Sequence, residues 1–281
     1  MSEVDATSFD ALMPPAMAEK AEAAGVAKAA LPTLRMFALA VLAGAFIALG
    51  AVFSTAATAG LSGALPYGVV RVIGGLTFSL GLILVVVAGA ELFTGNNLIV
   101  MAWAGRKVTT GQLLRNWAIV YVGNMVGATA TAVLVFLSGH FDGGGGIVGS
   151  NALAIASAKT QLGFPEAVAL GVLCNALVCL AVWLCMSARS TTDRILAVIF
   201  PITAFVAAGF EHSVANMYFI PAGLFLKSGA EPGQLASAGD LSHLTWDAFF
   251  VENLLPVTLG NIIGGSLLVG LVYWSIYLRK R

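Results

Sequence analysis

Two short polar segments interrupt long apolar stretches of this 281-residue chain, and they hold its best candidates for chemistry. In the later segment His212 stands between Glu211 and Ser213, and in the earlier one Thr94 supplies a hydroxyl. Ionisable side chains at membrane depth are functional candidates by default. We therefore predict that His212 lines a pore and that Thr94 donates to His212 or to a passing anion. The alternatives are a histidine that only satisfies freed backbone carbonyls and a threonine that only caps a helix.

Carboxylates and amides occupy matching places in the two polar segments. Glu91 and Asn96 in the first correspond to Glu211 and Asn216 in the second. We predict that both carboxylates are structural and reach the backbone amides at the start of the helix that follows, as an acidic residue does in a capping box. The two asparagines are predicted to be structural as well. A proton relay through the glutamates is the alternative.

The composition excludes several classes of protein. The chain is 59% hydrophobic and only 10% charged, and its 14 basic residues balance its 14 acidic ones. So few charges are not typical of a soluble enzyme. The balanced charge also leaves the chain without the basic surface that a nucleic-acid-binding protein needs. The sequence contains no phosphate-binding loop, catalytic triad, metal-ligand cluster or cofactor fingerprint. We predict no enzyme activity, no metal and no cofactor.

Uncharged stretches predict the membrane spans, since crossing the hydrocarbon core takes about 20 apolar residues. Five such stretches cover residues 36–70, 72–90, 116–140, 167–188 and 253–278. A sixth span is assembled from 195–210 and 217–226, on either side of His212, and the second span also runs into a polar segment at 91–97. The prediction is an all-α integral membrane protein with six transmembrane helices, of which the second and fifth are broken.

The two halves of the chain also match each other, at offsets that differ between segments. The matches include Phe37/Phe164 and Gly44/Gly171, offset by 127, Gly89/Gly209 and Asn96/Asn216, offset by 120, and Asn116/Asn253 and Asn124/Asn261, offset by 137. These pairs predict two repeats, 35–138 and 164–278, within one pore domain, 35–281. Because each repeat has three spans, the second must be inverted, and the two breaks should meet near the bilayer midplane. Amides freed at such breaks favour an anion.

Basic residues predict the orientation of the chain, because they favour the cytoplasmic side. One face holds 11 of the 14 lysines and arginines together with both predicted termini. We therefore expect cytoplasmic termini and a cytoplasmic segment 1–34, in which Phe9, Leu12, Met17 and Val26 form an amphipathic helix at the membrane surface or the pore mouth. Lys159 is expected as a lone cation on the outer face that draws anions, or as a snorkelling lysine.

Three stretches of the sequence resemble the formate/nitrite transporter family. They are Glu-Leu-Phe-Thr-Gly-Asn at 91–96, Gly-Phe-Glu-His-Ser-Val-Ala-Asn-Met at 209–217, and Pro-Val-Thr-Leu-Gly-Asn-Ile-Ile-Gly-Gly at 256–265. Residues 9–18 and 273–278 are similar to the formate-channel branch of that family. The resemblance implies an aquaporin-like protomer, a homopentamer with one pore in each protomer, and a place in the bacterial inner membrane.

The resemblance also implies roles for single residues. His212 would be the central pore histidine, with Thr94 as its partner, and Lys159 with Asn175 would attract anions at the outer mouth. The apolar constrictions above and below the histidine would be Phe78, Leu82, Leu92 and Phe205.

These parts predict a channel for formate and similar small monovalent anions such as other small monocarboxylates. A carboxylate that sheds its water pays a large free-energy penalty unless fixed dipoles or a proton compensate it. Because an imidazole titrates at about 6.5, His212 predicts pH-dependent gating. The first alternative is a channel of the same family that prefers nitrite. A channel for neutral solutes, a membrane enzyme and a structural membrane protein are more distant alternatives.

Overall fold

The computed structural model describes residues 11–229 and 240–279, and all of its regular elements are helical. Residue 9, residues 230–239 of the expected outer loop and the last two residues of the C-terminus lie outside the described residues. Short elements alternate with long ones. In chain order they are α1 (Pro14–Ala29), α2 (Thr33–Thr58), α3 (Tyr67–Ala88), α4 (Phe93–Asn96), η2 (Asn97–Ile99), α5 (Val100–Ala104), α6 (Thr110–Leu137), η3 (His140–Asp142), α7 (Ile147–Lys159), α8 (Phe164–Ser187), α9 (Thr191–Ala208), α10 (Ser213–Gly229), η4 (Ala248–Leu254), α12 (Leu255–Ile262), η5 (Ile263–Leu271) and α13 (Val272–Tyr277).

Six helical stretches are long and apolar enough to cross a membrane: α2, α3, α6, α8, α9 and the continuous run Ala248–Tyr277. The predicted number of spans is therefore confirmed, whereas several predicted ends were wrong. The first span stops at Thr58, well before residue 70, and the third begins at Thr110, so that it includes Arg115. An uncharged stretch locates a span but not its ends, because a loop can be apolar and a helix can begin with polar turns.

Glycines end α3 and α9 at equivalent places. Gly89 and Gly209 adopt left-handed φ angles of 82° and 80°, and each forms the C-cap of its helix. Glycine favours this cap because it has no Cβ to clash in the left-handed region. Residues 89–92 and 209–212 are not helical, and α4 and α10 start immediately after them.

The helix pairs α2/α6 and α8/α12–η5 touch backbone to backbone. A methyl group added at Gly127 would overlap the carbonyl oxygen of Val41, and one added at Gly264 would overlap that of Val172. Small residues allow this close approach between membrane helices. Val41 and Val172 are 131 residues apart, which is also the offset between the first residues of α2 and α8, whereas Gly127 and Gly264 keep the predicted offset of 137. The predicted offset of 127 is wrong by about one helical turn.

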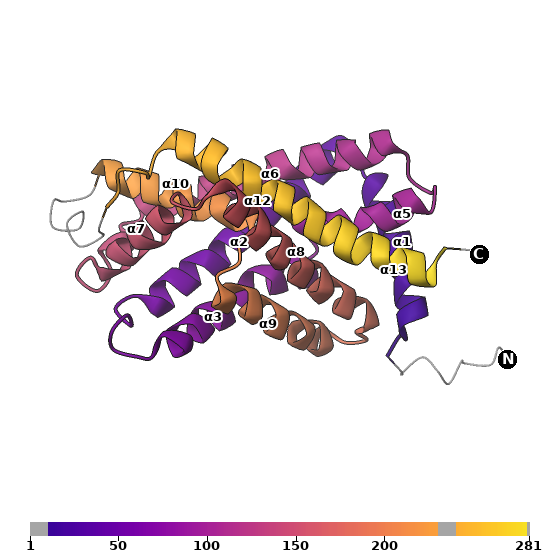
Figure 1. Cartoon of the computed structure of the whole chain (residues 1–281), viewed down its shortest axis with the longest axis horizontal. Helices are drawn as coiled ribbons and strands as arrows, with labels where there is room; N and C mark the ends of the chain where they lie inside the picture. Colours follow the sequence, from indigo (N-terminus) through magenta and orange to yellow (C-terminus); the bar gives the residue numbers. More distant parts are fainter. Residues whose placement is uncertain (1–10, 230–239, 280–281) are drawn as a thin grey trace.

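Helix α1 packs against the end of the bundle. Met17 and Ala21 are buried in a cluster with Leu98, Met101 and Trp183 from the neighbouring elements. In Figure 1, α1, α5 and α13 lie at one end of the long axis and α7 lies at the other.

Positive charge gathers at the α1 end. The Lys20 ammonium donates to the carbonyl oxygen of Met186 at 2.8 Å. Burial, followed by the positive charges of Arg194 and Arg189, lowers the pKa of Lys20 from its ordinary value.

We predict that alanine destabilises the protein at a glycine in close helix contact, Gly127, and not at an open helical glycine, Gly68. Gly127→Ala should lower the stability of the protein by about 1–3 kcal/mol, because the added methyl group has no room. Gly68→Ala is the matched control: Gly68 is also helical, but no atom lies within 4 Å of its added methyl group. That variant should be neutral or slightly stabilising. Thermal unfolding in detergent checks both, and equal melting temperatures for the two variants would contradict the packing argument.

Candidate functional site

His212 and Thr94 lie in contact at the centre of the buried region. His212 Nε2 is 2.9 Å from Thr94 Oγ1, and both residues are almost fully buried. His212 Nδ1 accepts the backbone N–H of Ala215 at 3.0 Å. An imidazole nitrogen that accepts a hydrogen bond carries no proton, so in the neutral ring Nε2–H is the donor to Thr94. The expected threonine-to-histidine donation is thus reversed, and the Thr94 hydroxyl proton is available for another acceptor.

Asn124 from α6 holds the start of α4. Its Oδ1 accepts the backbone N–H of Phe93 at 2.9 Å. Its amide nitrogen donates to the carbonyl oxygens of Ala40, at 2.8 Å, and Glu91, at 2.9 Å. One buried side chain therefore supplies three hydrogen bonds to backbone groups at and near the interruption, which water cannot reach at membrane depth.

Asn261 from α12 does the same at the start of α10. Its Oδ1 accepts the backbone N–H of Ser213 at 2.9 Å. Its amide nitrogen donates to the backbone carbonyl oxygens of Gly171, at 2.9 Å, and Glu211, at 3.0 Å. Asn124 and Asn261 are both completely buried. The pattern of three hydrogen bonds thus occurs twice in the described part of the chain.

Glu91 is hydrogen-bonded within the protein, but its partners differ from those expected. Its carboxylate accepts from Lys28 Nζ at 2.6 Å and from Asn96 Nδ2 at 2.7 Å. Asn96 also donates to Asn116 Oδ1, and the Asn116 amide returns to the Lys28 carbonyl oxygen. The prediction that the carboxylate reaches the freed backbone amides is wrong, because Asn124 occupies the amide of Phe93 at this point.

Glu211 repeats this arrangement with Lys159. The carboxylate accepts from Lys159 Nζ at 2.7 Å and from Asn216 Nδ2 at 2.6 Å. Asn216 donates to Asn253 Oδ1, and the Asn253 amide donates to the Lys159 carbonyl oxygen. The Lys159 side chain is only 15% exposed. It is therefore a paired and largely buried cation, and the prediction of a lone cation at the outer face is wrong.

Asn175 donates to residues of the first interruption and to α12. Its amide donates to the Thr94 carbonyl oxygen at 3.2 Å, to Asn97 Oδ1 at 3.1 Å and to the Asn261 carbonyl oxygen at 2.7 Å. Among the described residues Asn175 forms no hydrogen bond with Lys159. Asn175 instead joins α8 to the segment that carries Thr94.

The four predicted constriction residues are buried in the same core cluster as one another. The Phe205 ring lies 5.9 Å from the His212 ring, nearly parallel to it, and Phe78 meets Phe205 edge-on at 5.7 Å. Leu82 follows Phe78 by one turn of α3, and Leu92 directly precedes α4. The histidine thus has an aromatic neighbour on one side and the Thr94 hydroxyl at its Nε2.

No site role was predicted for Lys28, Asn124 or Asn261. The asparagines were visible as polar residues repeated inside apolar spans, which was the available signal. Lys28 had no such signal, since it lies in a helix that was expected to be separate from the pore domain.

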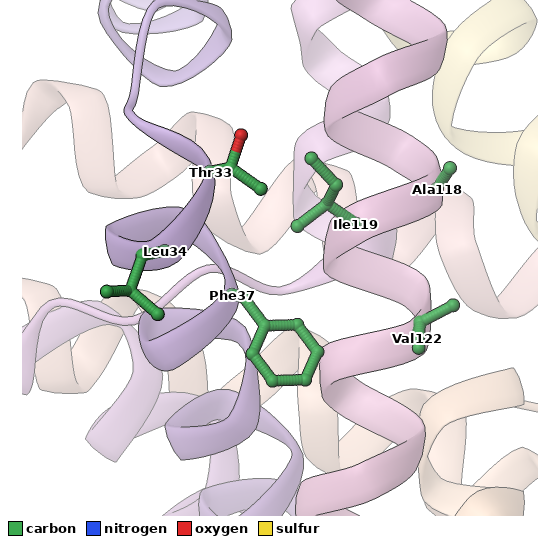
Figure 2. A pocket seen from close by; sticks show the side chains of 6 residues that line it. All are labelled: Thr33, Leu34, Phe37, Ala118, Ile119 and Val122. Atoms are coloured by element: carbon green, nitrogen blue, oxygen red, sulfur yellow. The ribbon is translucent and has the colours of Figure 1, made fainter.

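An apolar groove lies away from His212 and Thr94, on the surface of the bundle between α2 and α6. Figure 2 shows its lining, which consists of Thr33, Leu34, Phe37, Ala118, Ile119 and Val122. The groove has no titratable side chain and is not a candidate for anion passage. Within residues 11–229 and 240–279, no group of three or more metal-ligating side chains gathers.

The buried ion pair predicts a non-additive mutant cycle. Lys159→Met should destabilise the protein by about 3 kcal/mol, because it leaves the Glu211 carboxylate buried without its cation. The double variant Lys159→Met/Glu211→Gln should regain most of that loss. Lys107→Met is the comparison: its partner Glu22 is as buried as Glu211, but Lys107 itself is 57% exposed, so solvent screens this pair and the loss should be smaller than for Lys159→Met. Additive losses in chemical unfolding would contradict a coupled pair.

Comparisons with known proteins agree along most of the chain. A family model described as formate/nitrite transporter matches residues 15–275. The formate channel FocA of Escherichia coli (strain K12) is 50% identical over 276 residues, covering 97% of this chain and 96% of that protein. FocA of Haemophilus influenzae is 41% identical over 289 residues, and the match covers 99% of this chain and 99% of that protein.

The fold agrees as well. A solved structure titled "Pentameric formate channel with formate bound" matches with a TM-score of 0.82 at 45% identity, covering 88% of this chain and 98% of that one. These relatives are channels and not enzymes. The sequence motifs, the six apolar spans and the family match lead to the same conclusion: this multi-pass membrane protein belongs to the formate/nitrite transporter family.

Proposed function

We propose that this protein is a transmembrane channel for formate and similar small monovalent anions. The observation that carries the proposal is the buried Thr94–His212 pair beside the aromatic contact of Phe78 with Phe205. Such a site offers hydrogen-bond donors inside an apolar passage, which is what a dehydrated carboxylate needs. Formate as the substrate is supported by the names of the relatives.

We infer that the second and fifth spans are discontinuous and that the two halves are inverted repeats of an aquaporin-like protomer. The duplicated hydrogen bonds of Asn124 and Asn261 support this. Lys28 and Lys159 are related by the same offset of 131 residues as α2 and α8. We therefore extend the repeats proposed at 35–138 and 164–278, so that α1 belongs to the first and α7 to the second.

The site favours an anion through donors rather than through a buried net charge. The backbone amides of Phe93 and Ser213 are already bonded to asparagines. The remaining donors are the Thr94 hydroxyl and, after a small displacement, His212 Nε2–H. Both can donate to a carboxylate oxygen as it passes between the aromatic rings.

Proton binding by His212 is the proposed origin of pH-dependent passage. A second proton on the ring must enter at Nδ1, which accepts the N–H of Ala215. Protonation therefore breaks a bond at the start of α10, and an anion beside the ring favours the same protonation. Formate then passes either as the anion or, after it accepts a proton from the ring, as formic acid.

The proposed setting is the inner membrane of a bacterium, with both termini cytoplasmic. The basic cluster of Lys20, Arg189 and Arg194 lies at the α1 end, as the positive-inside rule requires of a cytoplasmic face. We also propose a homopentamer with one pore in each protomer, since the similar solved channel is described as pentameric.

Flux through purified protein in liposomes tests the proposal. Formate and nitrite currents are compared for the wild type, His212→Phe and Thr94→Val at pH values on both sides of 6.5, the approximate pKa of a free imidazole. We expect the formate current to exceed the nitrite current and its pH response to vanish in His212→Phe. Thr94→Val should lower the formate current about tenfold, because it removes a hydrogen bond to a charged group.

His243→Phe is the control, since His243 is an exposed histidine next to the expected outer loop. It should behave like the wild type. A nitrite current equal to or larger than the formate current would assign the protein to nitrite. The absence of both currents would favour a neutral solute.

A further inference from the structure

Arg71, in the second turn of α3, reaches across to the C-terminal end of α9. Its Nε–H donates to the Ala207 carbonyl oxygen at 3.2 Å, and its Nη2–H donates to the Val206 carbonyl oxygen. A Cβ added at Gly209 would lie 3.4 Å from Arg71 Nη2. The last carbonyls of a helix need partners and form its negative end, so a guanidinium is well suited to this place.

Arg71 also lies on the face of α3 that carries the proposed constriction. Phe78 follows it by seven residues, which is close to two turns, so the two side chains lie along the same stripe of the helix. The rise of a helix places Arg71 roughly 10 Å from Phe78 along the α3 axis. Helix α3 begins at the end of the molecule opposite α1 (Figure 1), and Arg71 lies in its second turn. With the proposed orientation, Arg71 is therefore on the outer side of Phe78.

The charge of Arg71 is not cancelled by a carboxylate. Its partners are the two neutral carbonyls and the ring of Tyr67, 6.0 Å from the guanidinium carbon. Among residues 11–229 and 240–279 it forms no ion pair with an acidic side chain. Lys159, which was expected to attract anions on this side, is neutralised by Glu211.

We propose that Arg71 is an entrance residue, which draws small anions to the outer mouth of the pore and fixes the end of α9 that carries Phe205. The proposal rests on the proposed function. A fixed charge at the mouth of a low-dielectric passage raises the local anion concentration and the entry rate, and salt screens the effect. The two hydrogen bonds keep this charge at a constant position relative to Phe78 and Phe205.

The test compares Arg71→Gln with Arg71→Lys in the full-length protein, in liposomes. We expect Arg71→Gln to raise the half-saturating formate concentration about three- to tenfold at low ionic strength, with little change in the saturated flux. High salt should remove most of the difference from the wild type. Arg71→Lys keeps the charge and should retain most of the apparent affinity.

Arg35→Gln is the matched control. It removes one exposed arginine near the start of α2, at the α1 end, and should leave the half-saturating concentration unchanged. Melting temperature and oligomer size are measured for every variant, because a purely structural residue would alter these instead.

Two results would overturn the inference alone. One is an Arg71→Gln variant with wild-type affinity for formate at low salt, in a protein that does carry formate. The other is an equal, salt-independent loss of flux in Arg71→Gln and Arg71→Lys, accompanied by lower melting temperatures, which would make Arg71 a structural residue only. Failure of the wild type to carry formate would overturn the proposed function and this inference with it.

Discussion

The requirement that backbone groups at membrane depth find partners within the protein governs this structure. Ending α3 and α9 inside the bundle leaves amides and carbonyls that would otherwise be unpaired. Asn124 and Asn261 satisfy them, with three hydrogen bonds from each side chain. These asparagines accept the first amides of α4 and α10, and His212 Nδ1 accepts the N–H of Ala215, so His212 Nε2 remains to bond to Thr94.

A second layer of polar groups surrounds the interruptions and has nearly zero net charge. Lys28 neutralises Glu91, and Lys159 neutralises Glu211. A buried carboxylate without its cation would be costly, so each pair ties a peripheral helix, α1 or α7, to the centre of its half. This explains why α1 packs as part of the bundle although its sequence suggests a separate amphipathic segment. In the proposed channel, an anion would therefore meet donors and apolar rings at the centre, and net positive charge farther out at Arg71.

The sequence was sufficient for the number of spans, for the two non-helical segments and for the pairing of His212 with Thr94, because hydropathy and isolated polar residues in apolar stretches are strong signals. It was insufficient for the register in which the first span aligns with the fourth. Alanine, valine and glycine recur at every turn of these helices, so an alignment shifted from 131 to 127 residues still matches several of them. It was also insufficient for partners. A glutamate that has freed amides, a lysine and an asparagine near it can accept a hydrogen bond from any of them. Only the fold decides that Glu91 accepts from Lys28 and Asn96.

The glycine contacts between α2 and α6 and between α8 and η5 bear on how such a pore opens. Where Gly127 meets Val41 and Gly264 meets Val172, no side chain separates the backbones, and neither helix can slide or rotate without a collision. The frame is therefore stiff, and in the proposed channel any change in bore would fall to the side chains that line it. Rotation of rings such as those of Phe78 and Phe205 involves few atoms and far less rearrangement than the rocking of one half-bundle against another. Turnover would then be limited by the passage of each ion, which is the kinetic behaviour of a channel rather than of a carrier.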